Sequence, residues 1–361
     1  MVREKLYVLR VREAESQRPE PADMRAMVLR APGELALDEV TLPATRDKQV
    51  RVRITHSGLC GTDLKIFNGS IPVCYPRIMG HELAGEVIDG DLPAGFSRGD
   101  RVIIDPVLFC GTCFHCRKAQ FSLCPNGGLI GRDTDGGFAE YAVVPASHAF
   151  RLPASMDTRT APLLQVATTC LHGQRRTPLF AGESVAVIGL GVSGQLHVQI
   201  AKARGAGTVV GISRSEFKNE MARGLGADVT VRAGEGAVAK VLEATEGRGA
   251  DVVIESTGVI SAVADAIRMA RFGGQILLFG IISAREGALP FYDLYFKELT
   301  LRNGRAAKAE DFPDMIGLVE RGAVRLEPLI THRMSLGELE AAIGMVEDGA
   351  ERRLKIILDH T

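Results

Sequence analysis

The stretch that decides the fold is SVAVIGLGVSGQLHVQIAKARG at residues 184–205. It opens with a short apolar run, turns at a cluster of glycines and continues as a helix-like segment. The turn carries Gly189, Gly191 and Gly194, which have the spacing G-x-G-x-x-G. In this pattern the first glycine permits a tight turn, the second lets a pyrophosphate approach the backbone, and the third lets helix and strand pack closely. The free N–H groups at the start of the helix would face the phosphates.

Strand-like and helix-like segments alternate on both sides of this turn, from about Ala161 onward. The apolar runs are SVAVIGL, TVVGIS, DVVIES and QILLFG, at 184–190, 208–213, 251–256 and 275–280. Such alternation predicts a parallel sheet covered by helices on both faces. A lone glycine motif can be an ordinary turn, but this one follows a strand, precedes a helix and lies among repeated strand–helix units. We therefore predict a dinucleotide site.

The part of the chain before this region has a different rhythm. From about Met24 to Pro153 it consists of short β-type runs broken by Gly, Pro and Asp, such as VRVRIT, GHELAGEVI, DRVIIDP and EYAVVP. This pattern predicts a mainly β domain. The preceding stretch from Glu13 to Asp23 is polar and contains two prolines, so we expect the first residues to form an extension outside the domain.

Composition excludes several classes of function. A chain of 361 residues favours two domains. A formal net charge of -1 gives no electrostatic argument for a nucleic-acid or anionic-membrane partner. No apolar run reaches the ~20 residues of a membrane span, and the charged N-terminus does not have the pattern of a secretory signal. We therefore expect a cytoplasmic protein whose cysteines are metal ligands or free thiols.

A group of four cysteines lies in CGTCFHCRKAQFSLC, at Cys110, Cys113, Cys116 and Cys124. Four thiolates at these spacings can form a closed tetrahedral zinc site, and the metal would supply the folding energy of a loop with little apolar surface. Disulfides do not fit the expected compartment, and a redox C-x-x-C pair explains only two of the four. A zinc-ribbon nucleic-acid binder would require a basic surface that the composition does not indicate.

A second group of possible metal ligands precedes this loop. The segments Cys60-Gly-Thr-Asp63 and Gly80-His81-Glu82 supply a thiolate, an imidazole and a carboxylate. A catalytic zinc ion uses three protein ligands and keeps one position open. Each residue alone would be weak evidence, but the combination with a closed zinc loop and a dinucleotide turn is specific.

These motifs resemble those of the zinc-containing medium-chain alcohol and polyol dehydrogenases, from Met24 to the end of the chain. The resemblance is carried by GHELAGEV, CGTD, the four cysteines and GLGVSG. It implies an α/β fold in which a Rossmann doubly wound parallel sheet is inserted into a GroES-like, mainly β catalytic domain. The implied limits are an extension at 1–23, the catalytic domain with its zinc loop at 24–155, the Rossmann domain at 156–295 and a return to the catalytic domain at 296–361.

The resemblance also implies roles for individual residues. Cys60 and His81 would bind the catalytic zinc, which would act as a Lewis acid on the substrate oxygen. Glu82 would lie beside the zinc or alternate as a ligand, and Asp63 would orient His81. Thr62 would carry the first hydroxyl of the proton relay. Val192 would belong to the cofactor turn, and Thr169 would pack near the nicotinamide. The expected partners are a small alcohol or carbonyl substrate and further copies of the chain in a homodimer or homotetramer.

The chain departs from the family pattern at the relay and at the zinc. Lys65 stands where many members have a histidine that passes the proton outward. The third zinc ligand is Cys or Glu in relatives, and an ungapped alignment of APLLQVATTC places Gln165 there, with Cys170 as the nearby rival.

A further departure lies at the end of the second Rossmann strand. NAD-specific members have an acidic residue there, whereas this chain has Ser213 followed by Arg214, with Lys218 farther on. A hydroxyl and a guanidinium can bind a 2′-phosphate that a carboxylate would repel. The sequence therefore predicts NADP(H), with NAD(H) as the alternative if Arg214 points to solvent.

The sequence thus predicts a zinc-dependent oxidoreductase that acts on a polyol, sugar or secondary alcohol. A zinc-free quinone or enoyl reductase would share the fold but would lack Cys60, the Gly-His-Glu triplet and the four-cysteine loop. A non-catalytic binding protein on the same scaffold would have a broken ligand set, and Gln165 is the one hint of that.

Overall fold

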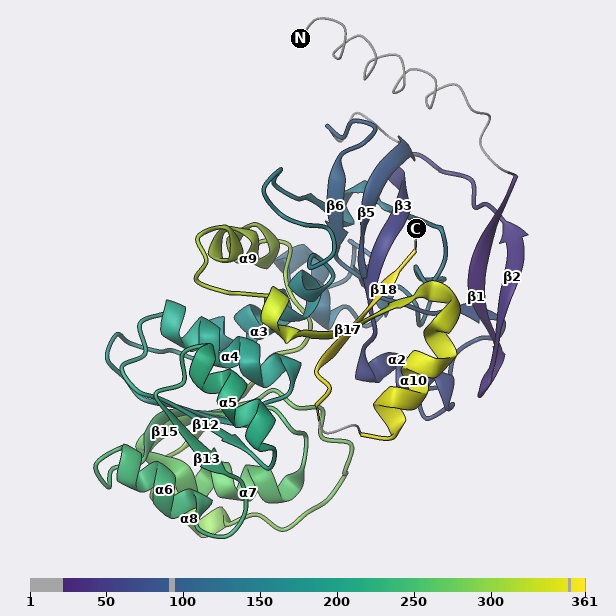
Figure 1. The fold of residues 1–361 in the computed structure, drawn as a ribbon. Helices are drawn as coiled ribbons and strands as arrows, with labels where there is room; N and C mark the ends of the chain where they lie inside the picture. The colour runs from purple at the N-terminus through teal and green to yellow at the C-terminus, as the bar shows by residue number, and fades with distance from the viewer. Residues whose placement is uncertain (1–21, 91–94, 350–351, 361) are drawn as a thin grey trace, which may run out of the picture.

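The computed structural model describes residues 22–90, 95–349 and 352–360 (Figure 1). The predicted extension at 1–23 lies outside these residues except for its last two. Asp23 already begins a strand, so the described fold starts one residue before Met24. The chain forms two domains, one rich in β-strands and one in which strands and helices alternate. In Figure 1 the yellow end of the chain lies among the purple and blue strands of the first domain.

The β-rich domain is built on a seven-stranded sheet and a three-stranded sheet. The larger sheet has the order β10 (Ala149–Arg151), β6 (Arg101–Ile104), β5 (Glu82–Gly90), β3 (Gln49–Gly58), β18 (Lys355–Asp359) and β17 (Ile330–Ser335), with β9 (Tyr141–Pro145) also paired to β3. The smaller sheet has the order β2 (Glu34–Thr41), β1 (Asp23–Ala31) and β4 (Arg77–Ile78). Because β18 pairs with β3, the end of the chain completes the sheet that its first third began.

The second domain is a six-stranded parallel sheet. Its order is β13 (Val229–Arg232), β12 (Val209–Ser213), β11 (Val185–Ile188), β14 (Ala250–Glu255), β15 (Ala270–Leu278) and β16 (Thr300–Asn303). Counted from β11, this is the Rossmann order 3-2-1-4-5-6. Every residue of β11, β12 and β14 is buried, which explains why these strands are nearly continuous apolar runs.

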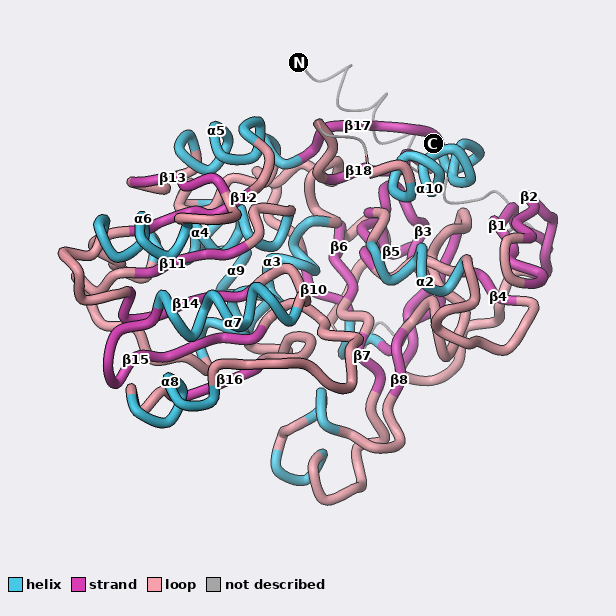
Figure 2. The backbone as a smooth tube through the Cα atoms, turned by 90° about the horizontal axis from the view of Figure 1, so that it is seen from below, coloured by secondary structure: helices cyan, strands magenta, loops and turns pink. Residues whose placement is uncertain are grey.

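The helices of this domain follow the strands. They are α4 (Val192–Ala203), α5 (Glu216–Gly224), α6 (Ala237–Ala244), α7 (Ile260–Met269) and α8 (Phe291–Phe296). Figure 2 shows the six strands side by side at one end of the molecule and the β-rich domain at the other. The predicted fold class is therefore confirmed.

One strand of the Rossmann sheet lies beyond residue 295, where the sequence placed the end of that domain. Strand β16 pairs with β15, as Ile276 with Leu301. All four of its residues are exposed, so the sequence TLRN contains no apolar run that would mark a strand. We propose to extend the Rossmann domain to residue 303.

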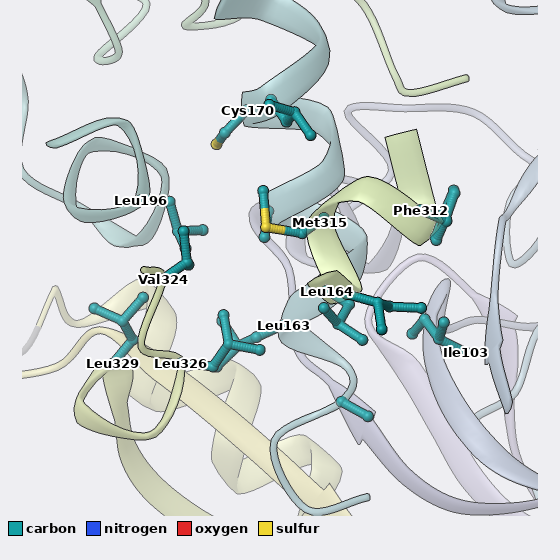
Figure 3. Packing of buried hydrophobic residues seen from close by; sticks show 14 of the residues in the cluster. Ile103, Leu163, Leu164, Cys170, Leu196, Phe312, Met315, Val324, Leu326 and Leu329 are labelled. Carbon is teal, nitrogen blue, oxygen red and sulfur yellow. The ribbon is translucent and has the colours of Figure 1, made fainter. Parts of the chain in front are cut away.

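A hydrophobic cluster joins the two domains. The helices α3 (Leu163–Arg175) and α9 (Asp311–Glu320) pack against each other and against α4. Ile103 of β6 belongs to the same cluster, and the ring of Phe150 stacks on that of Phe312 with centroids 4.5 Å apart. Figure 3 shows how Leu164 of α3, Phe312 of α9 and Ile103 of the β-rich domain meet there. This shared core fixes the two domains relative to each other.

The remaining described helices flank the β-rich domain. They are α2 (Gly61–Phe67) and α10 (Leu339–Glu347), which contact each other. The two-stranded ribbon of β7 (Val107–Leu108) and β8 (Gly128–Leu129) supports the loop that carries the four cysteines. In the described part of the chain, no helix has the length and apolar character needed to cross a membrane.

Candidate active site

Three of the predicted metal ligands lie together where β3 ends and β5 begins. Cys60 caps the N-terminus of α2, His81 immediately precedes β5, and Glu82 is the first residue of β5. One ligand atom from each lies within 4.8 Å of the others. A thiolate and an imidazole are the ligands that zinc prefers, so the donor set fits this metal.

Asp63 contacts both Cys60 and His81, the two residues that are predicted to bind the catalytic zinc. This residue is fully buried, and its Oδ2 accepts a hydrogen bond from the backbone N–H of Cys60 at 2.9 Å. Its Oδ1 lies 3.2 Å from Nδ1 of His81, which leaves Nε2 for a metal. Burial lowers the pKa of His81, but the charges of Asp63 and Cys60 outweigh this effect and raise it well above its ordinary value. The excess negative charge around the ring favours a bound cation.

Sequence reasoning missed a buried lysine at this site. Nζ of Lys355, in β18, donates to the two carboxylate oxygens of Glu82 at 2.8 and 2.6 Å and to the carbonyl oxygen of Leu59 at 3.0 Å. Lys355 and Glu82 are both buried, with exposed fractions of 4% and 1%. The signal in the sequence is a single lysine at the start of an otherwise mostly apolar strand, in LKIILD. Lys355 neutralises Glu82, so the carboxylate near the metal ligands does not carry an unpaired charge.

Gln165 lies in the first turn of α3, and α3 contacts β5, whose first residue is Glu82. Its backbone carbonyl accepts hydrogen bonds from the hydroxyls of Thr168 and Thr169. The rival Cys170 is buried elsewhere, and its Sγ lies 3.7 Å from the carbonyl oxygen of Ser193. Figure 3 shows Cys170 in the hydrophobic cluster that joins the two domains. Among the described residues, Cys170 does not join the cluster of Cys60, His81 and Glu82. The role of Gln165 stays a prediction.

Thr62, the predicted relay residue, shares one helix with Lys65, which stands where many relatives have a histidine. Thr62 and Lys65 both belong to α2, which begins next to Cys60, and both are half-buried. Their helix therefore starts at the candidate metal site, while their roles, like that of Thr169 near the nicotinamide, remain predictions.

The four cysteines of the loop meet at one point. Sulfur–sulfur distances are 4.0 Å between Cys110 and Cys116, 3.8 Å between Cys113 and Cys124, and 3.6 Å between Cys124 and Cys110. A tetrahedron with Zn–S bonds of about 2.3 Å has edges of about 3.8 Å. All seven cysteines are free thiols, so no disulfide competes for these sulfurs. The set fits a closed zinc site without a position for substrate.

A cavity of about 790 Å³ lies at the carboxyl ends of β11, β12 and β14. In a doubly wound sheet this is the switch point where ligands bind. Five of the predicted cofactor residues line it, namely Gly189, Gly191, Ser213, Arg214 and Lys218. Residues that the sequence reasoning did not single out also line it, among them Ser215, Ser256, Thr257 and Gly349. Val192, Gly194 and Thr169 do not belong to its lining.

The three glycines of the turn have distinct surroundings. Gly189 has a φ of +91°, which L side chains rarely adopt. A Cβ on Gly194 would lie 1.9 Å from the carbonyl oxygen of Gly189, so only glycine lets the helix approach the strand here. A Cβ on Gly191 would meet no atom within 4 Å, which leaves open space in front of the backbone. These are the surroundings that a pyrophosphate-binding turn requires.

The end of β12 offers hydroxyls and a guanidinium to this cavity. Ser213 is buried, and its Oγ accepts a hydrogen bond from the backbone N–H of Ser215 at 3.2 Å. The Oγ of Ser215 is itself buried and has no hydrogen-bond partner among the described residues. Arg214 is exposed on the cavity wall. An unpaired buried hydroxyl beside a guanidinium indicates that a polar, anionic group belongs there.

Known proteins match this chain over nearly its whole length. The family model described as alcohol dehydrogenase GroES-like domain matches residues 46–154, and the model described as zinc-binding dehydrogenase matches 193–321. The chain is 30% identical to a sorbitol dehydrogenase of Halalkalibacterium halodurans, over 90% of this chain and 96% of the relative. It is 34% identical to an L-threonine 3-dehydrogenase of Paraburkholderia phymatum, over 93% of this chain and 98% of that relative.

A solved structure agrees with this assignment. A zinc-binding dehydrogenase from Sinorhizobium meliloti, bound to NADP, superposes with a TM-score of 0.86 at 30% identity and covers 94% of this chain and 100% of its own. Fold, metal-ligand clusters and sequence matches therefore agree. The chain belongs to the zinc-dependent medium-chain alcohol dehydrogenase family and is an NAD(P)-dependent oxidoreductase.

Proposed function

We propose that this enzyme transfers a hydride between NADP(H) and a small secondary alcohol or polyol. The observation that carries the cofactor preference is Arg214 on the cavity wall, directly after Ser213 at the end of β12. A carboxylate at this place would bind the ribose hydroxyls of NAD and repel a 2′-phosphate. A guanidinium can instead form paired, charge-assisted hydrogen bonds with the phosphate.

The carboxylate that is closest to Arg214 in the sequence does not contradict this preference. Glu216 follows Ser215 in the chain, but its Oε1 accepts a hydrogen bond from Arg223 at 2.8 Å. Hydrogen bonds from Arg223 and Asn219 lower the pKa of Glu216, so its charge is already paired. It is also absent from the residues that line the cavity.

The candidate metal site supports the chemistry. Cys60 and His81 would hold a zinc ion, with Gln165 as the proposed third ligand, and this ion would supply a Lewis acid for the substrate oxygen. Asp63 would keep the His81 ring oriented, and the hydroxyl of Thr62 would accept the proton of the substrate hydroxyl while it passes its own proton outward to solvent. A bound nicotinamide would supply the hydride acceptor, and the glycine turn would hold the pyrophosphate of the same cofactor.

Two relatives support the substrate class. They act, by their names, on sorbitol and on carbon 3 of L-threonine. Sorbitol is a polyol, and carbon 3 of threonine carries a secondary hydroxyl. We therefore propose a secondary carbinol as the reacting group. The test measures the rate at which the oxidised cofactor is reduced with polyols, sugars and amino alcohols, and the rate at which the reduced cofactor is oxidised with 2-alkanones. Activity confined to primary alcohols would contradict the proposed class.

The cofactor preference is tested by the ratio of kcat/KM for NADP to that for NAD. We expect the parent to prefer NADP and Arg214→Ala to lower the ratio about 10- to 100-fold, because hydrogen bonds to a charged group contribute about 1.5–3 kcal/mol. Arg248→Ala is the matched control, since Arg248 is an exposed arginine paired with Glu246 outside the cavity. A parent enzyme that prefers NAD would contradict the proposal.

We also propose a homo-oligomer. Strand β16 is the edge of the Rossmann sheet and all of its residues are exposed, so its backbone groups are available for pairing. The adjoining α8 buries none of its side chains and exposes four aromatic residues, Phe291, Tyr292, Tyr295 and Phe296. Exposed apolar surface beside an open strand favours a second copy of the chain. Light scattering of the purified protein tests this, and a monomer mass would refute it.

A further inference from the structure

A buried carboxylate ends the strand that leads to the cofactor cavity. Glu255 is the last residue of β14, and its exposed fraction is 0%. It does not line the cavity itself, but Ser256 and Thr257, which follow it in the chain, do. A buried charge is costly unless hydrogen bonds satisfy it, so the partners of this carboxylate indicate its role.

Among the described residues, the hydrogen bonds of this carboxylate come from the loop that follows it. Oε1 of Glu255 accepts from the backbone N–H of Thr257 at 2.6 Å and from that of Gly258 at 3.1 Å. The hydroxyl of Thr257 donates to the same oxygen, and the N–H of Gly258 also lies 3.1 Å from Oε2. Hydrogen bonds to an ionised carboxylate are stronger than those between neutral groups. Glu255 therefore fixes both the backbone of this loop and one of its side chains.

On one side, the loop packs against the glycine turn. The backbone N–H of Ser256 donates to the carbonyl oxygen of Ile188, the last residue of β11, at 2.9 Å. The hydroxyl of Ser256 lies 3.1 Å from that of Ser193 in α4. A Cβ on Gly189 would lie 2.4 Å from Cγ2 of Thr257, so turn and loop are in close contact. The loop therefore forms the wall of the cavity next to the turn.

On the other side, the loop packs against the chain that follows β15. The carbonyl oxygen of Glu255 accepts hydrogen bonds from the backbone N–H groups of Phe279 at 2.8 Å and Gly280 at 2.9 Å. A Cβ on Gly280 would lie 2.1 Å from the backbone nitrogen of Gly258, so the two backbones approach closely. The loop thus has close backbone neighbours on both sides, and the carboxylate of Glu255 holds it between them.

We propose that Glu255 is a positioning residue for the cofactor, which acts through residues 256–258. Its carboxylate fixes Ser256 and Thr257, the two residues of this loop that line the cavity. Because the loop packs on the turn that would hold the pyrophosphate, loss of the carboxylate should weaken the binding of the dinucleotide. The inference concerns the loop and not the 2′-phosphate. It applies to NAD(H) and NADP(H) alike and does not depend on the cofactor preference proposed above.

The same strand offers a matched control. Asp251, the second residue of β14, is buried, and its Oδ2 accepts from the backbone N–H of Ser184 at 2.8 Å and from the hydroxyl of Ser184 at 2.6 Å. Its Oδ1 accepts from Nε of Arg271 at 2.5 Å. None of these three residues lines the cavity. Replacing Asp251 therefore removes a hydrogen-bonded carboxylate from β14 without reaching the cofactor.

The experiment compares the full-length parent with Glu255→Leu, Glu255→Gln and Asp251→Leu. We would measure Tm and, well below it, the dissociation constants of NADH and NADPH from the fluorescence of the reduced nicotinamide. Leucine leaves two backbone N–H groups of the loop without an acceptor, so Glu255→Leu should raise both constants about tenfold or more. Glutamine keeps one acceptor oxygen, so Glu255→Gln should raise them by only about two- to fivefold. Asp251→Leu should lower Tm but leave both constants within about twofold of the parent.

A purely structural role of Glu255 would lower Tm without changing the dissociation constants of the folded enzyme. If Glu255→Leu does not fold, the measurement on Glu255→Gln decides. Unchanged constants in every Glu255 variant that folds, or an equal rise in Asp251→Leu, would overturn the proposal.

Discussion

Replacing Lys355 by methionine should destabilise the protein more than any change at a surface ion pair. The substitution keeps the length of the side chain and removes the charge that balances Glu82. Because Glu82 is 1% exposed, its carboxylate would remain buried without a partner. Removing one member of a buried ion pair costs about 3–5 kcal/mol. With an unfolding entropy of about 2.1 cal/mol/K per residue, 361 residues convert this loss into a Tm lower by about 4–7 °C.

The measurement is thermal unfolding by circular dichroism at one zinc per chain, so that a metal near Glu82 does not replace the lost charge. Lys240→Met is the matched control. Lys240 pairs with Glu243 at 2.8 Å, close to the distance in the buried pair, but both side chains are exposed and the change should leave Tm unaltered. The double variant Glu82→Gln, Lys355→Met should recover most of the loss, because it removes both charges. A Lys355→Met protein with the Tm of the parent would refute the reasoning.

Three other changes test separate parts of the structure. Cys113→Ser should leave one zinc per chain and lower Tm, since the loop depends on its metal. A variant with two zincs by elemental analysis and the Tm of the parent would contradict the closed site. Burial raises the pKa of Asp105 from 3.8 to about 7, so the folded state keeps a proton that the unfolded chain loses, and stability falls as pH rises between these values. Asp105→Asn should therefore gain Tm relative to the parent from pH 5 to pH 8, and a constant difference in scanning fluorimetry would contradict this. Gln165→Glu should slow zinc loss to a mild chelator, because a carboxylate is a better zinc ligand than an amide, and unchanged loss would exclude Gln165 from the metal.

Much of the fold could be predicted because its signals are local. The strand, turn and helix around Gly189 lie within one short stretch, and the buried strands of the Rossmann sheet are mostly apolar, with Asp251 and Glu255 as the charged residues of β14. Strand β16 was missed for the opposite reason. It is an edge strand with every residue exposed, so nothing in Thr300–Asn303 selects apolar side chains. Its pairing with β15 is decided by tertiary structure alone.

The candidate site likewise contains residues that local motifs predict and residues that they do not. Cys60 and His81 stand in short motifs whose chemistry can be read residue by residue. Lys355 contacts Glu82 across 273 residues of sequence, and no periodicity or spacing connects such positions. A contact between distant segments is determined by the register of strands that pair far apart in the chain, which the sequence does not display.

The register of β18 is therefore what links the metal site to the end of the chain. Gly58 of β3 pairs with Ile357 on one side and with Glu82 on the other. A Cβ at Gly58 would lie 2.1 Å from Oε2 of Glu82, so the bare backbone makes room for this carboxylate. Lys355 lies two residues before Ile357 and so projects from the same face of the sheet toward Glu82. A slip of one residue in β18 would turn Lys355 to the other face and leave Glu82 unpaired. The buried ion pair therefore opposes such a slip, and the last strand is held in the one register that completes the site.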